Sequence, residues 1–429
     1  RTPNPTCFPQ FANFFNIALR YIVNRPPFSA AMSDQPSASN FATLCAHAGS
    51  KRRDPAPDNT AFVPPIEQST IFQLGNSADA EALFSGERTG YAYSRFGNPT
   101  VEALATALAD LEGGGGALVT GSGNAATLCA ISCALDGRTG PLVTHQDIYG
   151  GSFELLQILS TAHRVPVEFV DSTDQPAWLN AVSRAGAVLL ETPSNPLMRL
   201  IDLEATVAAA RASGAPLIVD NAVATPFNQR PLTFGADWVV QSTTKYLNGH
   251  SDMIGGAVIS RHPLTPAQRR IHKNLGGTVN AFDAWLVLRG LRTFALRMAA
   301  HNANGARIAA WLRDRPEVSR VHYAGSPDHP QADLCQRQMT HGGSVLSFEL
   351  AGGEVAAIRF IDRLGLIVHA VSLGGMESLA TRPAMSSHRG IPPADRARAG
   401  VSDSLIRLSV GIEAFEDLCA DLDQVLRPD

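Results

Sequence analysis

The chain alternates short apolar runs with stretches of helical spacing, and this alternation constrains its fold more than any other feature. The apolar runs are continuous, without a polar residue at every second position. They lie at 117–119, 141–143, 165–170, 187–190, 216–219 and 236–240. Continuous runs are typical of strands buried on both faces, and a helix between successive strands favours parallel pairing. The sequence therefore predicts an α/β fold built on a mostly parallel sheet.

Small or polar residues come directly after several of these runs. The segment 120–124 is a glycine turn that opens a helix, and Tyr149, Glu191, Asp220 and Lys245 come after later runs. Because the carboxyl ends of parallel strands share one edge, we expect these residues to gather at a ligand site. Free N–H groups at the glycine turn suit an anion. Glycines at such a junction can equally be structural, so this turn alone does not decide.

Lys245 lies in a turn between two buried runs. Burying a free ammonium is costly, so this lysine must reach solvent, pair with an anion or be used covalently. Ser242 and Thr244 could hold a phosphate beside the amine. The combination suggests pyridoxal 5′-phosphate bound through its aldehyde to Lys245. The alternative is a surface turn with a solvated lysine.

Pyridoxal chemistry also needs an acid beside the ring nitrogen, a flat partner for the ring and donors for the phosphate. Asp220 can supply the acid, and Tyr149 can stack on the ring and act as an acid or base. Candidate phosphate donors are Gly123, Asn124, Ser242 and Thr244, with Tyr93 and Arg95 as further donors. Asp220 could alternatively cap a turn, and Tyr149 could be an ordinary loop aromatic.

Composition excludes several classes of protein. The net charge of −4 offers no basic field for nucleic acid. The six cysteines are scattered without a CxxC pair, which makes a metal site improbable and favours reduced thiols in the cytoplasm. No run of eighteen apolar residues is present, so no membrane span is expected.

The length of 429 residues predicts two domains and an arm. We expect a leader at 1–40, an N-terminal arm at 41–97, a large domain at 98–285 and a small α+β domain at 286–429. A long helix over 281–304 should carry the chain from the large domain to the small one. The leader contains no acidic residue before Met32, and we favour Met32 as the natural start; a cleaved transit sequence is the alternative.

A series of motifs, in order from about residue 43 to the C-terminus, resembles the Cys/Met-metabolism family of pyridoxal-phosphate-dependent enzymes. The motifs are Tyr93–Thr100, Ser122–Gly123, Tyr149–Gly150, Glu191–Pro196, Val219–Asn221, Ser242–His250, Ser372–Gly375 and Arg407–Gly411. This family includes cystathionine γ-synthase, cystathionine γ-lyase, methionine γ-lyase and acylhomoserine sulfhydrylases.

The resemblance implies fold type I of the pyridoxal enzymes, as in aspartate aminotransferase, and a homotetramer made of two catalytic dimers. It implies that Tyr93 and Arg95 reach the phosphate in the neighbouring subunit. It further implies that Arg407 binds the α-carboxylate of an amino-acid substrate, assisted by Asn195 and Ser372.

The same resemblance implies γ-elimination or γ-replacement on a homoserine-derived amino acid, with Lys245 moving protons and Tyr149 protonating a departing thiol. Glu154 stands where many cystathionine enzymes carry an arginine, and Gly151 stands where methionine γ-lyases usually carry a cysteine. We therefore favour C–S cleavage of the cystathionine γ-lyase type. The alternatives are cystathionine γ-synthase or acylhomoserine sulfhydrylase, then methionine γ-lyase, and last a relative without catalysis that serves assembly or regulation.

Overall fold

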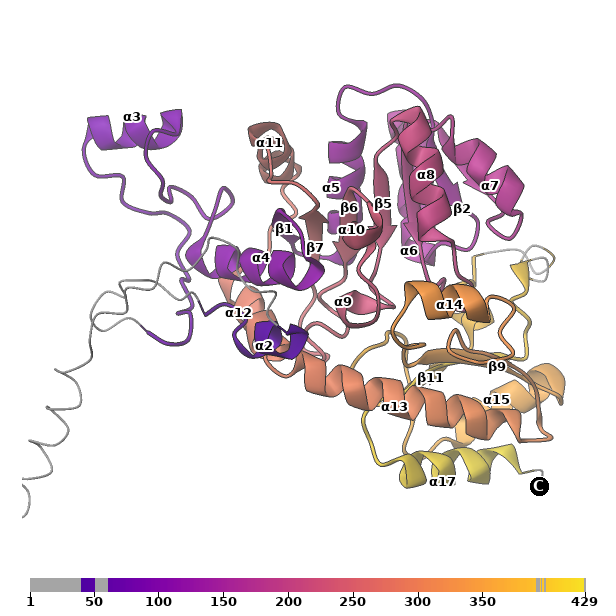
Figure 1. The fold of residues 1–429 in the computed structure, drawn as a ribbon. Helices are drawn as coiled ribbons and strands as arrows, with labels where there is room; N and C mark the ends of the chain where they lie inside the picture. Colours follow the sequence, from indigo (N-terminus) through magenta and orange to yellow (C-terminus); the bar gives the residue numbers. More distant parts are fainter. Residues whose placement is uncertain (1–39, 51–60, 391–393, 395, 397–398, 428–429) are drawn as a thin grey trace, which may run out of the picture. The chain divides into compact units, whose positions relative to one another are not determined.

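The computed structural model describes residues 40–50, 61–390, 394, 396 and 399–427 (Figure 1). The predicted leader lies outside these residues except for Asn40. Met32, the favoured natural start, and Cys7 therefore lie outside them as well.

A seven-stranded sheet forms the centre of the large domain, in the order β1-β7-β6-β5-β4-β2-β3. Its strands are β1 (Gly116–Thr120), β2 (Leu142–His145), β3 (Val167–Val170), β4 (Ala187–Glu191), β5 (Leu217–Asp220), β6 (Trp238–Gln241) and β7 (Gly256–Ser260). β7 runs antiparallel to both β1 and β6, whereas the pairs from β6 to β3 are parallel. The predicted α/β class with a mostly parallel sheet is confirmed.

Helices cover both faces of this sheet, which explains why most of its strand residues are apolar. Leu118 packs in one buried cluster with α5 (Gly123–Leu135) and α6 (Gly150–His163). The next residue, Val119, packs on the other face with α4 (Pro99–Glu112) and α12 (Ala281–Leu291). Further along the sheet, α7 (Gln175–Val182) and α8 (Leu203–Ser213) lie side by side (Figure 1). Successive side chains of a strand thus enter different layers of the core.

A second sheet of five strands forms the small domain, in the order β10-β11-β12-β9-β8. Its strands are β8 (Val318–His322), β9 (Val345–Leu350), β10 (Val368–His369), β11 (Leu379–Thr381) and β12 (Leu405–Ser409). Helices α13 (Phe294–Arg313), α15 (Gly353–Arg363) and α17 (Phe415–Leu426) pack their apolar residues against it (Figure 1). The predicted α+β character of the C-terminal part is confirmed. The strand β11 was not predicted.

The expected continuous helix over 281–304 is wrong. Helix α12 ends at Leu291 and α13 begins at Phe294. The carbonyl of Gly290 accepts a hydrogen bond of 2.8 Å from the guanidinium of Arg297 and another of 3.2 Å from the amide of Thr293. These bonds replace the regular helical bond of that carbonyl, so the chain turns between the two helices.

The start of the predicted arm contributes to the core. Helix α2 (Phe41–Ala46) buries Cys45. The ring of Phe41 lies 5.6 Å from that of Phe227 and 5.9 Å from that of Phe294. Helix α3 (Ser77–Ser85) has no buried residue. Residues 77–85 therefore match the expected arm, which has no core of its own. Residues 41–46 do not, because they pack on the core of the chain.

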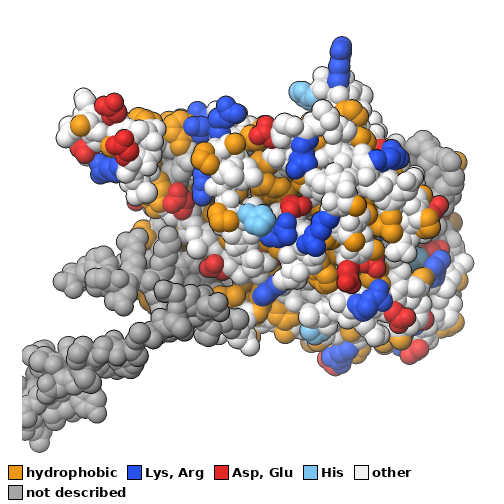
Figure 2. Space-filling view, turned by 45° about the horizontal axis from the view of Figure 1, so that its top comes forward, with side chains coloured by type: hydrophobic (Ala, Val, Ile, Leu, Met, Phe, Trp, Pro, Cys, Tyr) orange, Lys and Arg blue, Asp and Glu red, His pale blue; other side chains and the backbone are white. Residues whose placement is uncertain are grey.

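The remaining elements are short. They are α9 (Thr225–Asn228), α10 (Pro231–Phe234), α11 (Pro266–Leu275), α14 (Ala332–Gln338) and the 3₁₀ turn η1 (Pro383–Met385). Among the described residues, no helix combines the length and apolarity that a membrane crossing requires, and no group of three or more potential metal ligands occurs. Figure 2 shows basic and acidic side chains dispersed over the face in view.

Candidate active site

Lys245 comes after strand β6 in a turn that its own backbone stabilises. The amide of Lys245 donates to the carbonyl of Ser242 over 3.1 Å, and the carbonyl of Lys245 accepts from Gly249 over 2.8 Å. Its Nζ donates to the hydroxyl of Ser372 over 2.6 Å. Burial lowers the pKa of Lys245 to about 8, and the nearby positive charge of Arg407 lowers it too. A sizeable fraction of this amine is therefore unprotonated, and nucleophilic, in mildly alkaline solution.

Asp220 ends the neighbouring strand β5. The register places Asp220 opposite Val240, so the aspartate and the Lys245 turn extend from adjacent strands at the same edge of the sheet. Burial raises the pKa of Asp220 to about 6, although the hydrogen bond from the amide of Ala222 opposes this shift. A protonated ring nitrogen beside this carboxylate would stabilise its charged form. The predicted placement of Asp220 and Lys245 on either side of one ring stays a prediction.

Arg407 on β12 brings a buried positive charge to the site. Its side chain is 5% exposed, and its Nη2 donates to the carbonyl of Ser372 over 2.6 Å. Within the described residues it forms no ion pair, and its Nε has no hydrogen-bond partner. Ser372 itself has a φ of +91°, in the left-handed region that side chains rarely adopt. A buried guanidinium without an anion suits a substrate carboxylate.

The amide of Asn195 is a second buried group with spare hydrogen-bonding capacity. Its Oδ1 has no partner among the described residues. Asn195 belongs to the loop after β4, in which the Thr192–Pro193 and Asn195–Pro196 peptide bonds are cis. Arg407 thus offers an unsatisfied donor that suits a carboxylate, whereas the unsatisfied Oδ1 of Asn195 is an acceptor, so Asn195 could bind a carboxylate only through its amide nitrogen.

The glycine turn lies directly beside the lysine turn. A Cβ added to Gly123 would come within 3.3 Å of the Ser242 hydroxyl, so the start of α5 packs closely against the Ser242 side chain. The hydroxyl of Ser122 accepts from the amide of Ala125 and thereby caps the helix. The amides of the first helical turn, with the Ser242 hydroxyl opposite them, form a donor set that fits a phosphate.

Two other predicted phosphate ligands already have protein partners. The hydroxyl of Thr244 donates to the carbonyl of Gly255 and accepts from its amide, over 3.1 and 3.0 Å. The amide of Asn124 donates to the carbonyl of Gly151 over 3.2 Å. The role of Thr244 and Asn124 in cofactor binding stays a prediction.

Tyr149 precedes α6, and its side chain is 45% exposed. Its backbone amide donates to Glu191 over 2.7 Å. A Cβ added to Gly151 would come within 2.6 Å of the Tyr149 ring. The ring therefore lies against Gly151, and a larger residue there would move the ring.

Tyr93 and Arg95 lie in the segment between α3 and α4. Tyr93 forms a β-bridge with Ile71, and Arg95 donates to the carbonyl of Lys273 over 2.7 Å. The Arg95 guanidinium stacks 5.0 Å from the ring of Phe96. No hydrogen bond of the described residues joins Tyr93 or Arg95 to the group around Lys245. Their predicted contact with a neighbouring subunit stays a prediction.

Two residues that contact the site have no role predicted from the sequence. Arg297 is buried, and it donates to the backbone carbonyls of Tyr246 and Leu247, directly after Lys245. The sequence places Glu191 only at the end of a strand, although its carboxyl group binds the amide of Tyr149. An arginine inside a helix gives no sequence signal for such contacts, whereas a glutamate at the end of a buried strand does.

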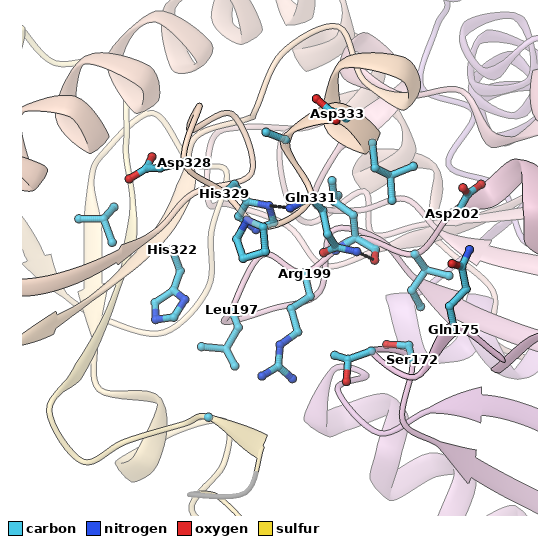
Figure 3. Close-up of a pocket in the computed structure, with 18 of the residues that line it drawn as sticks. Ser172, Gln175, Leu197, Arg199, Asp202, His322, Asp328, His329, Gln331 and Asp333 are labelled. Carbon is cyan, nitrogen blue, oxygen red and sulfur yellow. Dashed lines mark hydrogen bonds between the residues drawn. The ribbon is translucent and has the colours of Figure 1, made fainter. Parts of the chain in front are cut away.

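A cavity of about 1080 Å³ lies apart from these residues (Figure 3). Its walls come from the segments 172–179, 197–202 and 318–337, so both domains line it. Arg199, His322 and His329 are among the polar residues that face it (Figure 3). It contains none of the predicted site residues.

Three features fit a pyridoxal-phosphate-dependent enzyme: a doubly wound sheet, a lysine and an aspartate that follow adjacent strands, and an arginine of the small domain that forms no ion pair with the described residues. The chain belongs to the family described as Cys/Met metabolism PLP-dependent enzymes, whose model matches residues 42–427. The resemblance carried by the motifs is confirmed, and with it the cofactor and the enzymatic character.

Several relatives are similar over nearly the whole chain. O-succinylhomoserine sulfhydrylase of Pseudomonas aeruginosa is 38% identical, over 89% of this chain and 94% of the relative. L-methionine gamma-lyase of Pseudomonas putida is 39% identical, over 90% and 97%. Cystathionine gamma-synthase of Escherichia coli is 40% identical, over 85% and 93%.

A solved structure agrees with this assignment. The cystathionine gamma synthase of Xanthomonas oryzae pv. oryzae, in complex with cystathionine, superposes with a TM-score of 0.82 at 40% identity, over 91% of this chain and 98% of that chain. Because relatives with different activities are about equally similar, the comparisons establish a pyridoxal-phosphate-dependent enzyme of trans-sulfuration. They do not assign the individual reaction.

Proposed function

We propose that this enzyme cleaves the C–S bond of cystathionine or a related thioether by γ-elimination. The observation that carries this choice is Glu154, which is exposed on α6 five residues after Tyr149 and forms no ion pair with any described residue. Its carboxylate would repel the negatively charged succinyl tail of O-succinylhomoserine, whereas the distal end of cystathionine carries an ammonium group beside its carboxylate and has no net charge. Gly151, which lies against the ring of Tyr149, counts against methionine γ-lyase, whose members usually carry cysteine there.

Bound pyridoxal phosphate would supply an electron sink for the α-carbon of the substrate. Lys245 would bond the cofactor aldehyde and, when released, move the α proton; its lowered pKa of about 8 suits both tasks. Asp220 would face the ring nitrogen. Gly123 and Ser242 would hold the phosphate, helped by Asn124 and Thr244.

The remaining site residues would bind and orient the amino acid. Arg407 would bind the α-carboxylate with two parallel hydrogen bonds, and Asn195 would add a third. Ser372 lies between Lys245 and Arg407, and its hydroxyl would guide the lysine amine toward the substrate. Tyr149 would stack on the ring and protonate the departing thiol.

We further propose that the enzyme is a homotetramer in which Tyr93 and Arg95 complete the phosphate site of a neighbouring subunit. Large apolar side chains of the preceding segment support this: Phe62, Ile71 and Phe84 are more than half exposed in the single chain. Contact with a second copy would bury them. We keep the proposed domain boundaries at 98–285 and 286–429, since α12 and α13 connect the two sheets.

γ-Replacement, as in cystathionine γ-synthase, is the second candidate, because the relative that carries this name is 40% identical. Incubating the purified enzyme in turn with cystathionine, O-succinylhomoserine, O-acetylhomoserine and methionine separates the candidates. We expect cystathionine to release a 2-oxo acid without an added thiol. If only O-succinylhomoserine together with cysteine reacts, the enzyme is a synthase and the proposal is wrong.

A further inference from the structure

Glu191 touches several parts of the site without belonging to the groups proposed to bind cofactor or substrate. It ends strand β4 and is 4% exposed. Its neighbour in the sheet register is Asp220. Its backbone amide donates to Nε2 of His145 over 3.0 Å, at the end of strand β2. Its carboxyl group accepts from the amide of Tyr149 over 2.7 Å.

The hydrogen bond to Glu191 is important because Tyr149 has few other anchors. The side chain is 45% exposed, and no hydrogen bond of its hydroxyl occurs within the described chain. Apart from the helical bond from Phe153 to its carbonyl, the amide bond to Glu191 is what fixes its backbone. The position of the ring beside Gly151 therefore depends on this one acceptor.

A second link joins the same turn to the loop that carries Asn195. Asp147 forms an ion pair of 2.5 Å with Arg199, which Figure 3 shows at the edge of the cavity. The carbonyl of Arg199 accepts from the amide of Ser194 over 2.8 Å. Glu191 immediately precedes this loop. Two contacts thus link the turn at 147–149 to the chain around the loop at 192–196: the hydrogen bond from Tyr149 to Glu191 before the loop, and the ion pair from Asp147 to Arg199 after it.

We propose that Glu191 is a positioning residue that holds Tyr149 in place relative to Asp220 by accepting the hydrogen bond of the Tyr149 amide. This inference rests on the proposed role of Tyr149 in stacking and proton transfer. It assigns a task to a buried carboxyl group that does not itself touch the substrate.

The surroundings of Glu191 favour its neutral form. Burial raises its pKa well above the ordinary value, and the nearby carboxylates of Asp220 and Asp147 raise it too, against the amide bond from Tyr149. Among the described residues no cation pairs with it directly. A neutral carboxyl group still offers an oxygen to the Tyr149 amide, and it adds no negative charge beside Asp220, whose own charge the cofactor needs.

The proposal predicts that Glu191→Gln preserves the site and Glu191→Leu does not. Glutamine is neutral and keeps the acceptor oxygen, so kcat should stay within about threefold of wild type. Leucine takes the acceptor away from the part-buried hydrogen bond of the Tyr149 amide, and kcat should fall by about 10- to 100-fold with KM changed less than about threefold. Glu191→Met, closer in shape to glutamate, replaces the leucine variant if that variant does not fold.

A readout without substrate is the circular dichroism of the absorption band of bound pyridoxal phosphate, which reports how the ring is held. We expect the leucine variant to lose most of this signal and the glutamine variant to keep it. This measurement stands even if cystathionine is not the substrate, and the kinetic comparison can use whichever amino acid wild type turns over.

Asp421→Asn is the matched control. Asp421 is also a buried carboxylate, and it accepts hydrogen bonds from the amides of Gly365, Leu366 and Ile367 in the small domain. The Asp421→Asn substitution should lower stability without changing kcat or the circular dichroism of the cofactor. If Asp421→Asn lowers kcat as much as Glu191→Leu does, the loss in the leucine variant reflects general destabilisation and the proposal is wrong. Loss of activity in the glutamine variant, or normal activity in the leucine variant, would overturn the proposal.

Discussion

The amine of Lys245 lies 2.6 Å from the hydroxyl of Ser372, although 127 residues separate them in the chain. The lysine belongs to the large sheet domain, and the serine lies in the small domain. The same serine accepts a hydrogen bond from Arg407 through its carbonyl. The small domain therefore presents its arginine to the lysine through a single strained residue.

This arrangement predicts a link between Arg407 and the basicity of Lys245. Replacing Arg407 with glutamine removes a positive charge that lowers the pKa of Lys245, so this pKa should rise above its value of about 8. The pH dependence of the rate at which apoprotein takes up pyridoxal phosphate measures this shift. In addition, KM for the amino acid should rise by about 100-fold, since a charged hydrogen bond to the carboxylate is lost. An unchanged pH profile would contradict the electrostatic link.

Gly151 should influence the orientation of the Tyr149 ring in this enzyme. An alanine Cβ would come within 2.6 Å of the tyrosine ring, so Gly151→Ala should lower kcat by about tenfold or more. Gly390→Ala is the control, because a Cβ there meets no atom of the described residues within 4 Å. If both variants keep full activity, the ring position inferred for catalysis is wrong.

Glu112 should make the stability of the apoprotein depend on pH. This buried residue on α4 accepts from the side chains of Gln241 and Asn221 over 2.6 and 3.2 Å. Burial raises its pKa from 4.5 to about 7. A raised pKa means that the folded protein binds the proton more tightly than the unfolded chain. The stabilisation is complete below about pH 4.5 and is lost as the pH rises through about 7.

Glu112→Gln cannot ionise and should escape this loss. Between about pH 5 and pH 8, the unfolding free energy of wild type should fall by about 2–3 kcal/mol more than that of the variant. Urea unfolding of the apoproteins at both pH values measures the difference. Glu102→Gln, at an exposed position of the same helix, should behave like wild type. If the unfolding free energies of wild type and Glu112→Gln depend on pH in the same way, ionisation of Glu112 does not destabilise the folded protein and this prediction is wrong.

Arg297 should stabilise the turn that carries Lys245. Its guanidinium donates to the carbonyls of Tyr246, Leu247 and Gly290, and it has no acidic partner among the described residues. Arg297→Met should therefore destabilise the protein by about 2–4 kcal/mol and loosen the covalent cofactor site. Arg307→Met on the same helix removes an exposed pair with Glu416 and the stacking of the guanidinium over the ring of Phe415, and should cost clearly less than Arg297→Met. Equal losses in both variants would contradict the role of Arg297.

The strands of the large domain could be predicted because buried parallel strands consist of continuous apolar runs. The edge at which the site forms followed, because the carboxyl ends of parallel strands lie at one edge of the sheet. Lys245 and Asp220 could be predicted from their places after such runs. The proximity of Arg407 to Lys245 could not be derived in that way. It depends on Ser372, which contacts both residues and lies 127 residues after Lys245, and local sequence patterns do not report contacts over such separations. Only the family motifs pointed to Arg407.

Two further differences between the expectations and the structure have local causes. The helix expected over 281–304 is interrupted because the side chain of Arg297 and the amide of Thr293 take the carbonyl of Gly290, and no periodicity records such a bond. Residues 41–46 were assigned to an arm because the segment 41–97 has little regular periodicity and much proline and glycine, yet aromatic contacts of Phe41 pack residues 41–46 on the core. Tertiary contacts decided both cases.

Every role proposed for the site requires pyridoxal phosphate to be bonded to the amine of Lys245. Borohydride reduction of the coloured holoenzyme, followed by digestion and mass spectrometry, tests it most directly. We expect one reduced cofactor on the peptide that contains Lys245, and none on Lys273, the other lysine among the described residues. A label on any other lysine, or no label on a protein that binds the cofactor, would show that Lys245 does not hold the cofactor covalently.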